Sequence, residues 1–341
     1  MQDGLLSRIG EALAAKQATL RQWFDSADQE EVRAALGPSG EAPFREHMHL
    51  LDTARGQAED GSLGICTVCH EPVEDELILM DYTSCVCLSH LSEAEQRSLE
   101  SELELAQTVQ QSLLPQHPPD VPGLEVAAYS RPAQVVGGDY FDFFPFKDGR
   151  QGIVISDVAG HGMSSSLIMA SLQTMLRTLS MDSDHPADLV TRINQLCLHN
   201  IQFTTFISLF LSAFDPKTRT FTYCNAGHNP PLLIRRDAAR TVEWLEPSGA
   251  AVGLVEGSVY RDRSISMAPG DLVFLYTDGV TEANNVQGDL FGARRMAGVI
   301  SEHRDLPAQD LLHAMRDQLG AFTGGGPPSD DVTMVAFRVT S

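Results

Sequence analysis

Basic residues are scarce in this sequence. Lys and Arg number 24 against 46 Asp and Glu in 341 residues, which gives a formal net charge of −22. Binding to a nucleic acid depends on clustered Lys and Arg that neutralise its phosphates. The deficit argues against a sequence-independent nucleic-acid binder, and we expect no nucleic-acid partner.

Long apolar runs are absent too. The longest, such as residues 206–214, are short and interrupted by serine, whereas a membrane-spanning helix needs about 20 apolar residues. Residues 1–4 lack the basic n-region and the apolar h-region of a signal peptide. These absences predict a cytoplasmic protein without a membrane partner, and the 43% apolar content suffices for a folded core.

The motifs of several enzyme classes are also missing. The sequence contains no P-loop, no G-x-S-x-G elbow and no H-E-x-x-H motif. A nucleotide hydrolase, a serine hydrolase and a zinc protease therefore lack support. The sequence also contains no internal repeat and no low-complexity tract.

What is present divides the chain into three parts, which we predict at residues 1–91, 92–115 and 116–341. The first part has helical periodicity over residues 5–36 and 44–57, followed by four of the six cysteines. We expect this part to be a regulatory module.

The second part is a predicted helix over residues 92–114. It begins at Ser92, whose spacing from Glu95 is that of a capping box, and it ends before Pro115. An apolar seam, interrupted by Gln110, runs along it through Leu99, Leu103, Ala106 and Leu113. The seam predicts either a homodimer through this helix or packing of the helix on its own domain.

The third part has a pattern of strands separated by Gly and Pro turns, with a few helices. The expected strands cover residues 124–129, 140–146, 152–157, 203–214, 218–225, 232–234, 272–277 and 332–339. The expected helices cover residues 163–180, 187–200, 293–303 and 308–322. Because the strands come in runs rather than alternating with helices, we predict an α+β fold of antiparallel sheets with helices packed outside.

Four aspartates stand at junctions between a predicted strand and a turn: Asp139, Asp157, Asp278 and Asp330. Neighbouring glycines allow the backbone to approach closely there. Carboxylates that converge repel one another, and a hard divalent cation removes that penalty by taking their oxygens as ligands. Each aspartate alone fits a turn former equally well, but the four together predict a metal site.

Five short motifs punctuate the third part. They are Val-Gly-Gly-Asp-Tyr-Phe-Asp at 136–142, Asp-Val-Ala-Gly-His-Gly at 157–162, Asn-Ala-Gly-His-Asn-Pro-Pro at 225–231, Tyr-Thr-Asp-Gly-Val-Thr-Glu-Ala at 276–283 and Asp-Asp-Val-Thr at 330–333. With them, residues 107–339 resemble the SpoIIE-like, RsbU-type branch of the metal-dependent type 2C phosphatases. The resemblance implies a four-layer α-β-β-α sandwich, two antiparallel sheets flanked by helices, with two Mn²⁺ or Mg²⁺ ions at the sheet edge.

Carried over residue by residue, the resemblance implies a ligand set for these ions. Asp157 would bridge both metals. Asp139 would serve one metal, with the main-chain carbonyl of Val158 beside it. Asp278 and Asp330 would hold the other.

Five further residues have open roles. The resemblance implies that His161 either protonates the leaving oxygen or stabilises a turn, and that His228 is either structural or catalytic. Asp331 ranks behind Asp330 as a ligand because adjacent residues on a strand face opposite ways. Asp142 is expected to support the site from outside or to face solvent, and Arg131 is not assigned as a phosphate clamp.

The implied activity is that of a protein serine/threonine phosphatase. A metal-bridged water would attack the phosphorus of phosphoserine or phosphothreonine in line, without a covalent phosphoenzyme. The implied substrate is a phosphorylated anti-sigma-factor antagonist of the STAS type. Two alternatives are a non-catalytic adaptor with a phosphatase fold, which the complete aspartate set disfavours, and a zinc-finger transcription regulator, which the acidity disfavours.

The clustered cysteines form a second candidate site. Cys66 and Cys69 are separated by two residues, and 17 residues later Cys87 and His90 repeat that spacing. Paired spacing of this kind predicts a tetrahedral Zn²⁺ site, with Cys85 as an alternative ligand and a redox dithiol or unliganded buried thiols as alternative interpretations. Residues 51–90 also resemble the zinc finger of DksA/TraR-type proteins, with a histidine in the last ligand position, and we expect a structural or sensing module.

Overall fold

The computed structural model of the protein describes residues 13–14, 17–18, 21, 24, 41–66, 68–73, 86–87, 90, 92–160, 162–200, 205–236 and 242–340. The chain forms two compact units, Met1–Glu102 and Leu103–Ser341. Within the described ranges, no helix is long and apolar enough to cross a membrane. The three-part division at residues 91 and 115 stays a prediction.

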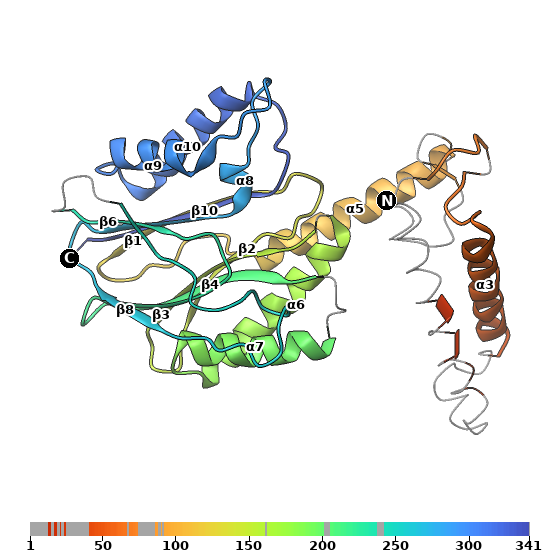
Figure 1. Ribbon diagram of the computed structural model, residues 1–341, viewed down its shortest axis with the longest axis horizontal. Helices are drawn as coiled ribbons and strands as arrows, with labels where there is room; N and C mark the ends of the chain where they lie inside the picture. Colours follow the sequence, from red (N-terminus) through yellow and green to blue (C-terminus); the bar gives the residue numbers. More distant parts are fainter. Residues whose placement is uncertain are drawn as a thin grey trace. The chain divides into compact units, whose positions relative to one another are not determined.

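The larger unit contains two five-stranded antiparallel sheets among its described residues (Figure 1). The first sheet has, in spatial order, β1 (Leu124–Arg131), β10 (Val332–Val339), β9 (Leu272–Tyr276), β6 (Leu232–Ile234) and β7 (Val242–Trp244). The second has β2 (Tyr140–Pro145), β3 (Gln151–Val158), β4 (Ile207–Asp215), β5 (Thr220–Ala226) and β8 (Arg263–Ser266).

An aromatic core joins the two sheets face to face. Phe221 of β5 and Phe337 of β10 belong to opposite sheets, and their ring centroids are 5.1 Å apart. Phe210 of β4 stacks on Tyr223 of β5 at 5.3 Å, and all four rings are buried. Because aromatic rings bury large apolar areas in defined geometries, this core holds the strands of both sheets in place.

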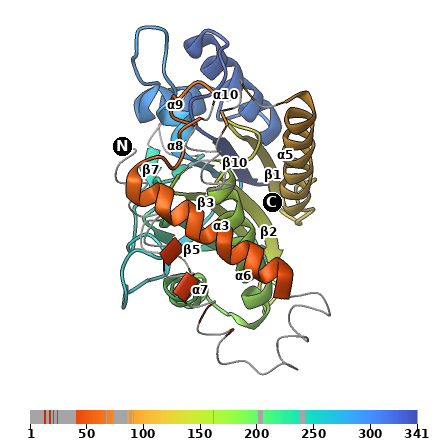
Figure 2. The same cartoon turned by 90° about the vertical axis from the view of Figure 1, so that its right-hand side faces the viewer.

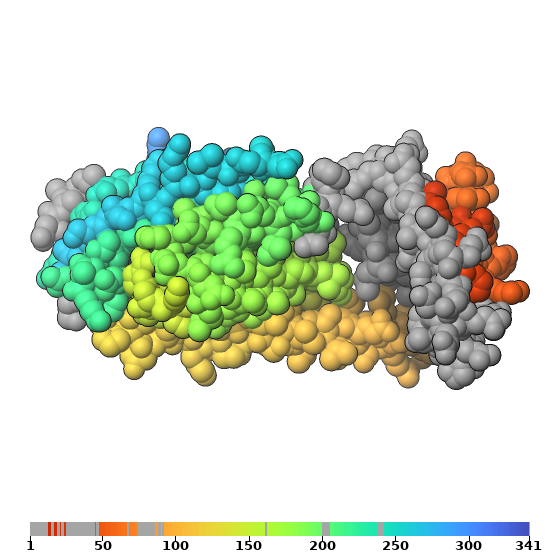
Figure 3. Space-filling model, turned by 90° about the horizontal axis from the view of Figure 1, so that it is seen from below, coloured from red at the N-terminus to blue at the C-terminus, as the bar shows by residue number. Residues whose placement is uncertain are grey.

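Helices cover the outer face of each sheet (Figures 1 and 2). The second sheet packs against α6 (Met163–Leu179) and α7 (Pro186–Asn200). Side chains of both helices and of the sheet form one apolar cluster. Figure 3, viewed from the side of these helices, shows their atoms in green over that face. The first sheet packs against α9 (Gly292–Glu302) and α10 (Ala308–Thr323) through a second cluster.

The predicted α+β four-layer sandwich is thus confirmed. A strand covered on both faces is apolar along its whole length instead of alternating. The strand β4 illustrates this, since seven of its nine residues are buried, including both neighbours Leu209 and Phe210. Such runs are visible in the sequence, which is why the long strands were predicted within a few residues.

Three short elements were missed by the sequence analysis. They are β7, β8 and the one-turn helix α8 (Asp278–Thr281). The two strands are exposed or half-buried edge strands, held by pairing with β6 and β5. Because each has only three or four residues, their side-chain pattern is too short to predict a strand. A short 3-10 turn, Ser180–Asp182, also follows α6.

The smaller unit contains α3 (Glu41–Asp60) and the start of α5 (Glu93–Leu113). Helix α3 packs through Leu51 and Ala54 against Leu13 and Leu63. The predicted capping box at the start of α5 is confirmed, because the Ser92 N–H donates to Glu95 Oε2 at 2.8 Å. Of the predicted helix at 5–36, only six residues are described, and those are helical.

Candidate metal centre

The first two predicted aspartates meet at one end of the second sheet. Tyr140 of β2 pairs with Ser156 of β3. Continuing this antiparallel register by one residue puts Asp139, just before β2, opposite Asp157, near the end of β3. The start of one strand and the end of the next thus deliver two carboxylates to the same edge.

The other two come from the first sheet in the same way. Tyr276 of β9 pairs with Met334 of β10. Asp278 therefore follows the end of β9, at the start of α8, and Asp330 precedes β10. Both sheets end at the site, so four strand termini contribute to it.

Electrostatic interactions connect these aspartates across the two sheets. Burial, followed by the charges of nearby carboxylates, raises the pKa of Asp157 to about 7. These carboxylates belong to Asp278, Asp330, Asp331 and Glu282. The pKa of Asp278 is raised as well, first by burial and then by Asp330 and Glu282. So many acidic groups together favour a bound cation, which would relieve their repulsion.

Asp139 has a buried carboxylate with one free oxygen. Its Oδ2 accepts a hydrogen bond from Thr277 Oγ1 at 2.8 Å, whereas its buried Oδ1 has no partner among the described residues. Burial, then the charges of Asp157 and Asp331, raise its pKa well above the usual range. A buried oxygen without a hydrogen bond is costly, and a hard divalent cation is the ligand that fits it.

The aspartates are more widely spaced than the ligands of a single ion. Among the described residues, no group of three carboxylates has oxygens all within 4.8 Å of one another. A spread of this kind suits residues that are shared between two ions a few ångströms apart.

Asp331 supports the loop that carries Asp139. Its Oδ1 accepts the N–H of Ala133 at 2.8 Å, and its Oδ2 accepts the N–H of Gly138 at 2.7 Å. The side chain is buried, whereas that of Asp330 is exposed. Asp331 therefore has its oxygens engaged by the backbone, which supports the ranking of Asp330 as the ligand. No local pattern in the sequence indicates this supporting role, because the partners lie 193 and 198 positions away.

Glycines allow the close approach of this loop. A Cβ at Gly137 would lie 2.2 Å from Oδ2 of Asp331, which no real contact permits. A Cβ at Gly138 would lie 2.9 Å from the main-chain oxygen of Val158. The carbonyl predicted as a ligand therefore lies beside the Asp139 loop, and glycine is needed at both positions.

Gln110 of α5 holds the same loop from another side. Its Nε2 donates to the main-chain oxygen of Gly137 at 2.6 Å, and its Oε1 accepts the N–H of Gly137 at 3.1 Å. In the sequence, Gln110 appears only as an interruption of an apolar seam. The two bonds span 27 positions, so no local signal could have revealed them.

Of the two histidines in the motifs, the structure describes His228 and not His161. His161 lies outside the described residues, and its predicted role stays a prediction. His228 is buried, and its Nδ1 lies 2.7 Å from Ser208 Oγ. Ser208 pairs with Asp157 across β3 and β4. Burial lowers the pKa of His228 to about 4, so the ring is neutral at pH 7 and supports the strand next to Asp157.

Asp142 is buried and does not face solvent. Arg177 donates to both of its carboxylate oxygens at 2.6 Å, and Tyr140 Oη donates to it at 2.6 Å. It therefore ties β2 to α6, which agrees with support of the site from outside. Arg131 ends β1 in register with Val332 and is exposed, and its role stays open.

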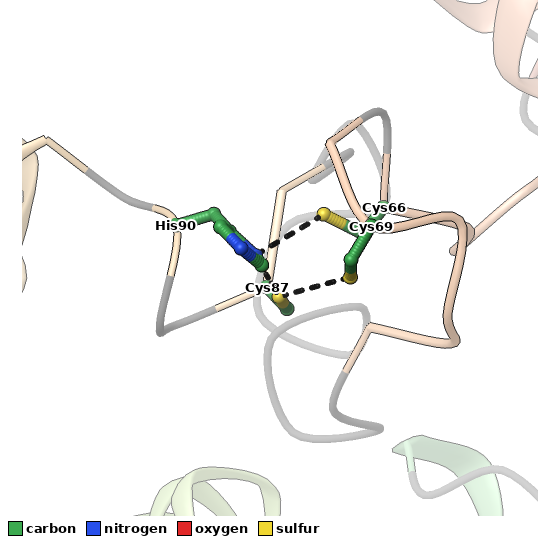
Figure 4. A group of neighbouring side chains, drawn as sticks. All are labelled: Cys66, Cys69, Cys87 and His90. Atoms are coloured by element: carbon green, nitrogen blue, oxygen red, sulfur yellow. Dashed lines mark hydrogen bonds between the residues drawn. The ribbon is translucent and has the colours of Figure 1, made fainter.

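The predicted cysteine–histidine group is brought together in the smaller unit (Figure 4). One ligand atom from each of Cys66, Cys69, Cys87 and His90 lies within 4.8 Å of the others. Hydrogen bonds from the backbone N–H groups of Cys69 and Cys87 lower the pKa of the Cys66 thiol to about 6. Cys85, the alternative ligand, lies outside the described residues.

The sequence and the fold were compared with known proteins. Residues 147–340 match the model of the family described as Stage II sporulation protein E, SpoIIE. Over 243 residues the chain is 30% identical to phosphoserine phosphatase RsbU of Bacillus subtilis, covering 71% of each protein. Over 242 residues it is 26% identical to phosphoserine phosphatase RsbP of the same organism, covering 70% of this chain and 58% of that protein.

Among solved structures, the SiaA-PP2C domain of Pseudomonas aeruginosa superposes with a TM-score of 0.64. It is 24% identical, and the match covers 72% of this chain and 99% of that one. This likeness shows the fold, and the sequence relatives bear out the predicted enzyme class. With the family model matched over more than half of this chain, the chain belongs to the SpoIIE family.

Proposed function

We propose that the chain is a Mn²⁺- or Mg²⁺-dependent phosphatase that hydrolyses phosphoserine or phosphothreonine in a protein substrate. One observation carries the proposal: the buried Asp139 has an unpaired Oδ1 in a group of carboxylates whose pKa values are raised. The phosphoserine phosphatase relatives RsbU and RsbP support the reaction class.

The residues that would hold two divalent cations are Asp139, Asp157, Asp278, Asp330 and, through its main-chain oxygen, Val158. Bound there, the cations would supply Lewis acidity, lowering the pKa of a coordinated water and offsetting charge on the phosphoryl oxygens. Oxygen donors of this kind suit Mg²⁺ and Mn²⁺ rather than softer metals.

The chain's own residues prepare this site before any cation arrives. Thr277 fixes one oxygen of Asp139 by a hydrogen bond and leaves the other for a cation. Asp331 and Gln110 fix the loop in front of Asp139 from two sides. Preorganised ligands of this kind bind a cation without a large cost of reordering.

The substrate that we infer is a phosphorylated anti-sigma-factor antagonist of the STAS type, by likeness to the RsbU-type branch. We also infer that residues 1–91 regulate the phosphatase through α5, because its Gln110 contacts the Asp139 loop. A change in the position of α5 along or about its axis would break these two bonds and loosen the loop.

The test is hydrolysis of a phosphoserine peptide and of a chromogenic phosphate ester by the purified full chain, with and without Mn²⁺. We expect turnover that requires Mn²⁺ and is lost in Asp157→Asn. Asp305→Asn is the matched control, because that carboxylate is 92% exposed in the turn between α9 and α10. Equal rates in excess chelator, or an active Asp157→Asn variant, would overturn the proposal.

If the full wild-type chain is inactive, a truncated chain provides a further test. If regulation through the N-terminal unit keeps the site closed, a chain without residues 1–91 should gain Mn²⁺-dependent activity. If that truncated chain is folded by circular dichroism and still inactive, a non-catalytic adaptor with a phosphatase fold replaces the enzyme as the better proposal.

A further inference from the structure

The cysteine–histidine group lies outside both the family match and the proposed phosphatase site. It combines two sequence pairs, Cys66 with Cys69 and Cys87 with His90, separated by 17 residues. The pairs face each other (Figure 4). Four soft or borderline ligands at one point are unusual on a protein that otherwise needs only hard oxygen ligands for its reaction.

The distances match those of a tetrahedral metal site. Zn–S bonds of about 2.3 Å and Zn–N bonds of about 2.0 Å separate neighbouring ligand atoms by roughly 3.5–3.8 Å. Cys69 Sγ and Cys87 Sγ are 3.7 Å apart, and Cys66 Sγ and His90 Nδ1 are 3.8 Å apart. Cys87 Sγ and His90 Nδ1 are closer, at 2.9 Å, and would separate by roughly half an ångström around an ion.

The backbone around the first pair is already shaped for ligation. Cys66 donates its N–H to Glu71 and its carbonyl accepts the N–H of His70 at 2.9 Å. His70 has a positive φ of 59°, which turns the chain back on itself. The N–H of Val68 points at Cys66 Sγ, at 3.4 Å, and so stabilises a thiolate. The turn therefore presents both sulfurs of the pair to one side.

A disulfide does not account for the group. The Cys69 and Cys87 sulfurs are 3.7 Å apart, far longer than the S–S bond of about 2.05 Å. None of the cysteines that the structure describes forms a disulfide. With three cysteines in the group, one disulfide could join only two of them, and the third sulfur and the imidazole would stay outside it.

We propose that Cys66, Cys69, Cys87 and His90 bind one Zn²⁺ ion, and that this ion is structural. Four protein ligands complete its coordination and leave no open position for a substrate, as in structural zinc sites. Thiolate and imidazole ligands also select Zn²⁺ over the Mn²⁺ or Mg²⁺ of the phosphatase site.

The ion would connect segments whose apolar contacts are few in the part of the chain that the structure describes. Among those residues, the apolar cluster at the site has three buried members, Cys66, Val73 and Cys87. So small a core rarely supports a fold without a metal or a disulfide. Leu99 of α5 packs against the same cluster. The zinc site would therefore also fix the start of α5.

The experiment measures metal content of the purified full chain by inductively coupled plasma mass spectrometry, after dialysis against Mn²⁺. We expect one zinc per chain in the wild type and at least a fivefold loss in Cys69→Ser. His70→Asn is the matched control, because His70 is exposed next to the site and asparagine tolerates its positive φ. This variant should keep one zinc.

Cobalt substitution provides a second readout that does not depend on a variant folding. Co²⁺ exchanged into the wild type should give thiolate-to-cobalt charge-transfer absorption, absent from Cys69→Ser. Asp157→Asn should retain one zinc, so failure of the phosphatase proposal and failure of the zinc proposal are distinguishable. A wild type without zinc or charge-transfer bands, or a Cys69–Cys87 disulfide found by mass spectrometry, would overturn the inference.

Discussion

At the scale of single residues, two neighbouring aspartates in one motif have opposite surroundings. Asp330 is exposed, while the carboxylate of Asp331 accepts backbone N–H groups from Ala133 and Gly138. A carboxylate that accepts several backbone N–H groups is held in one position by them. Substitutions of the two residues should therefore change the Mn²⁺ dependence of the phosphatase rate in different ways.

Asp331→Asn should weaken the site without abolishing it. The amide puts an NH₂ group where an oxygen accepted a backbone N–H, so at least one charge-assisted hydrogen bond is lost, at about 1.5–3 kcal/mol. We expect the Mn²⁺ concentration for half-maximal activity to rise about 10- to 100-fold, with activity restored at high Mn²⁺.

Asp330→Asn provides the comparison for Asp331→Asn. Because Asp330 is a predicted metal ligand, the Asp330→Asn variant should lose phosphatase activity that high Mn²⁺ does not restore. Mn²⁺ titrations of the phosphatase rate separate the two cases. Identical titrations for both variants would contradict the supporting role of Asp331.

His228 should make the stability of the larger unit pH-dependent. Burial lowers its pKa from 6.5 to about 4, so between these values the unfolded chain binds a proton that the folded chain does not. The free energy of unfolding should fall as the pH is lowered from about 6.5 to 4, by about 2 kcal/mol between pH 7 and pH 5.

Urea denaturation at both pH values measures this change. His228→Asn keeps a polar group near Ser208 and should lose about 2 kcal/mol of the pH dependence. His313→Asn is the control, because His313 is 53% exposed. A His228→Asn variant with the wild-type difference between pH 7 and pH 5 would refute the assignment.

At the scale of secondary-structure elements, α5 has two differently engaged parts. Near its start, Leu99 packs on the cysteine–histidine group. Near its end, Gln110 binds Gly137, and Leu114 just beyond packs on the apolar core of the larger unit. Neither Gln110 nor Leu114 is one of the apolar residues of the predicted seam, so the homodimer and packing of the seam on its own domain both stay predictions.

Gln110→Ala should loosen the Asp139 loop by removing both hydrogen bonds to Gly137. Two neutral hydrogen bonds at about 1 kcal/mol each predict a 5- to 30-fold rise in the Mn²⁺ concentration for half-maximal activity. Gln111→Ala is the matched control, since its side chain is exposed on the same helix. Equal Mn²⁺ dependence of the two variants would show that the contact has no part in ordering the site.

At the scale of the whole molecule, the metal centre depends on two sheets being held in one relative position. The Phe221–Phe337 contact joins them. Phe337→Ala should lower the free energy of unfolding by about 3–5 kcal/mol, because it opens a cavity in a fully buried aromatic core. Urea denaturation measures the loss.

The control for this variant is Val286→Ala, at a side chain that is 83% exposed. We expect it to stay within about 0.5 kcal/mol of the wild type. If Phe337→Ala were equally mild, the inter-sheet core would be less important to stability than its burial indicates.

Much of this protein could be predicted from local patterns. Apolar runs located the long strands, and Ser92 with Glu95 located the start of α5. The spacing of Cys66, Cys69 and their partners identified the ligands that the structure brings together. The strand runs and the capping box each lie within a few residues, and the four metal ligands lie within 24 positions of one another, so short-range patterns reveal them.

The sequence by itself thus determined the fold class and the cysteine–histidine group, and it predicts the aspartate set. Only the tertiary structure decided that Asp331 supports the Asp139 loop, that Gln110 binds Gly137 and that short exposed strands complete both sheets. The physical reason is distance along the chain. The partners of Asp331 lie about 190 residues away, and contacts so remote exist only once the two sheets have packed.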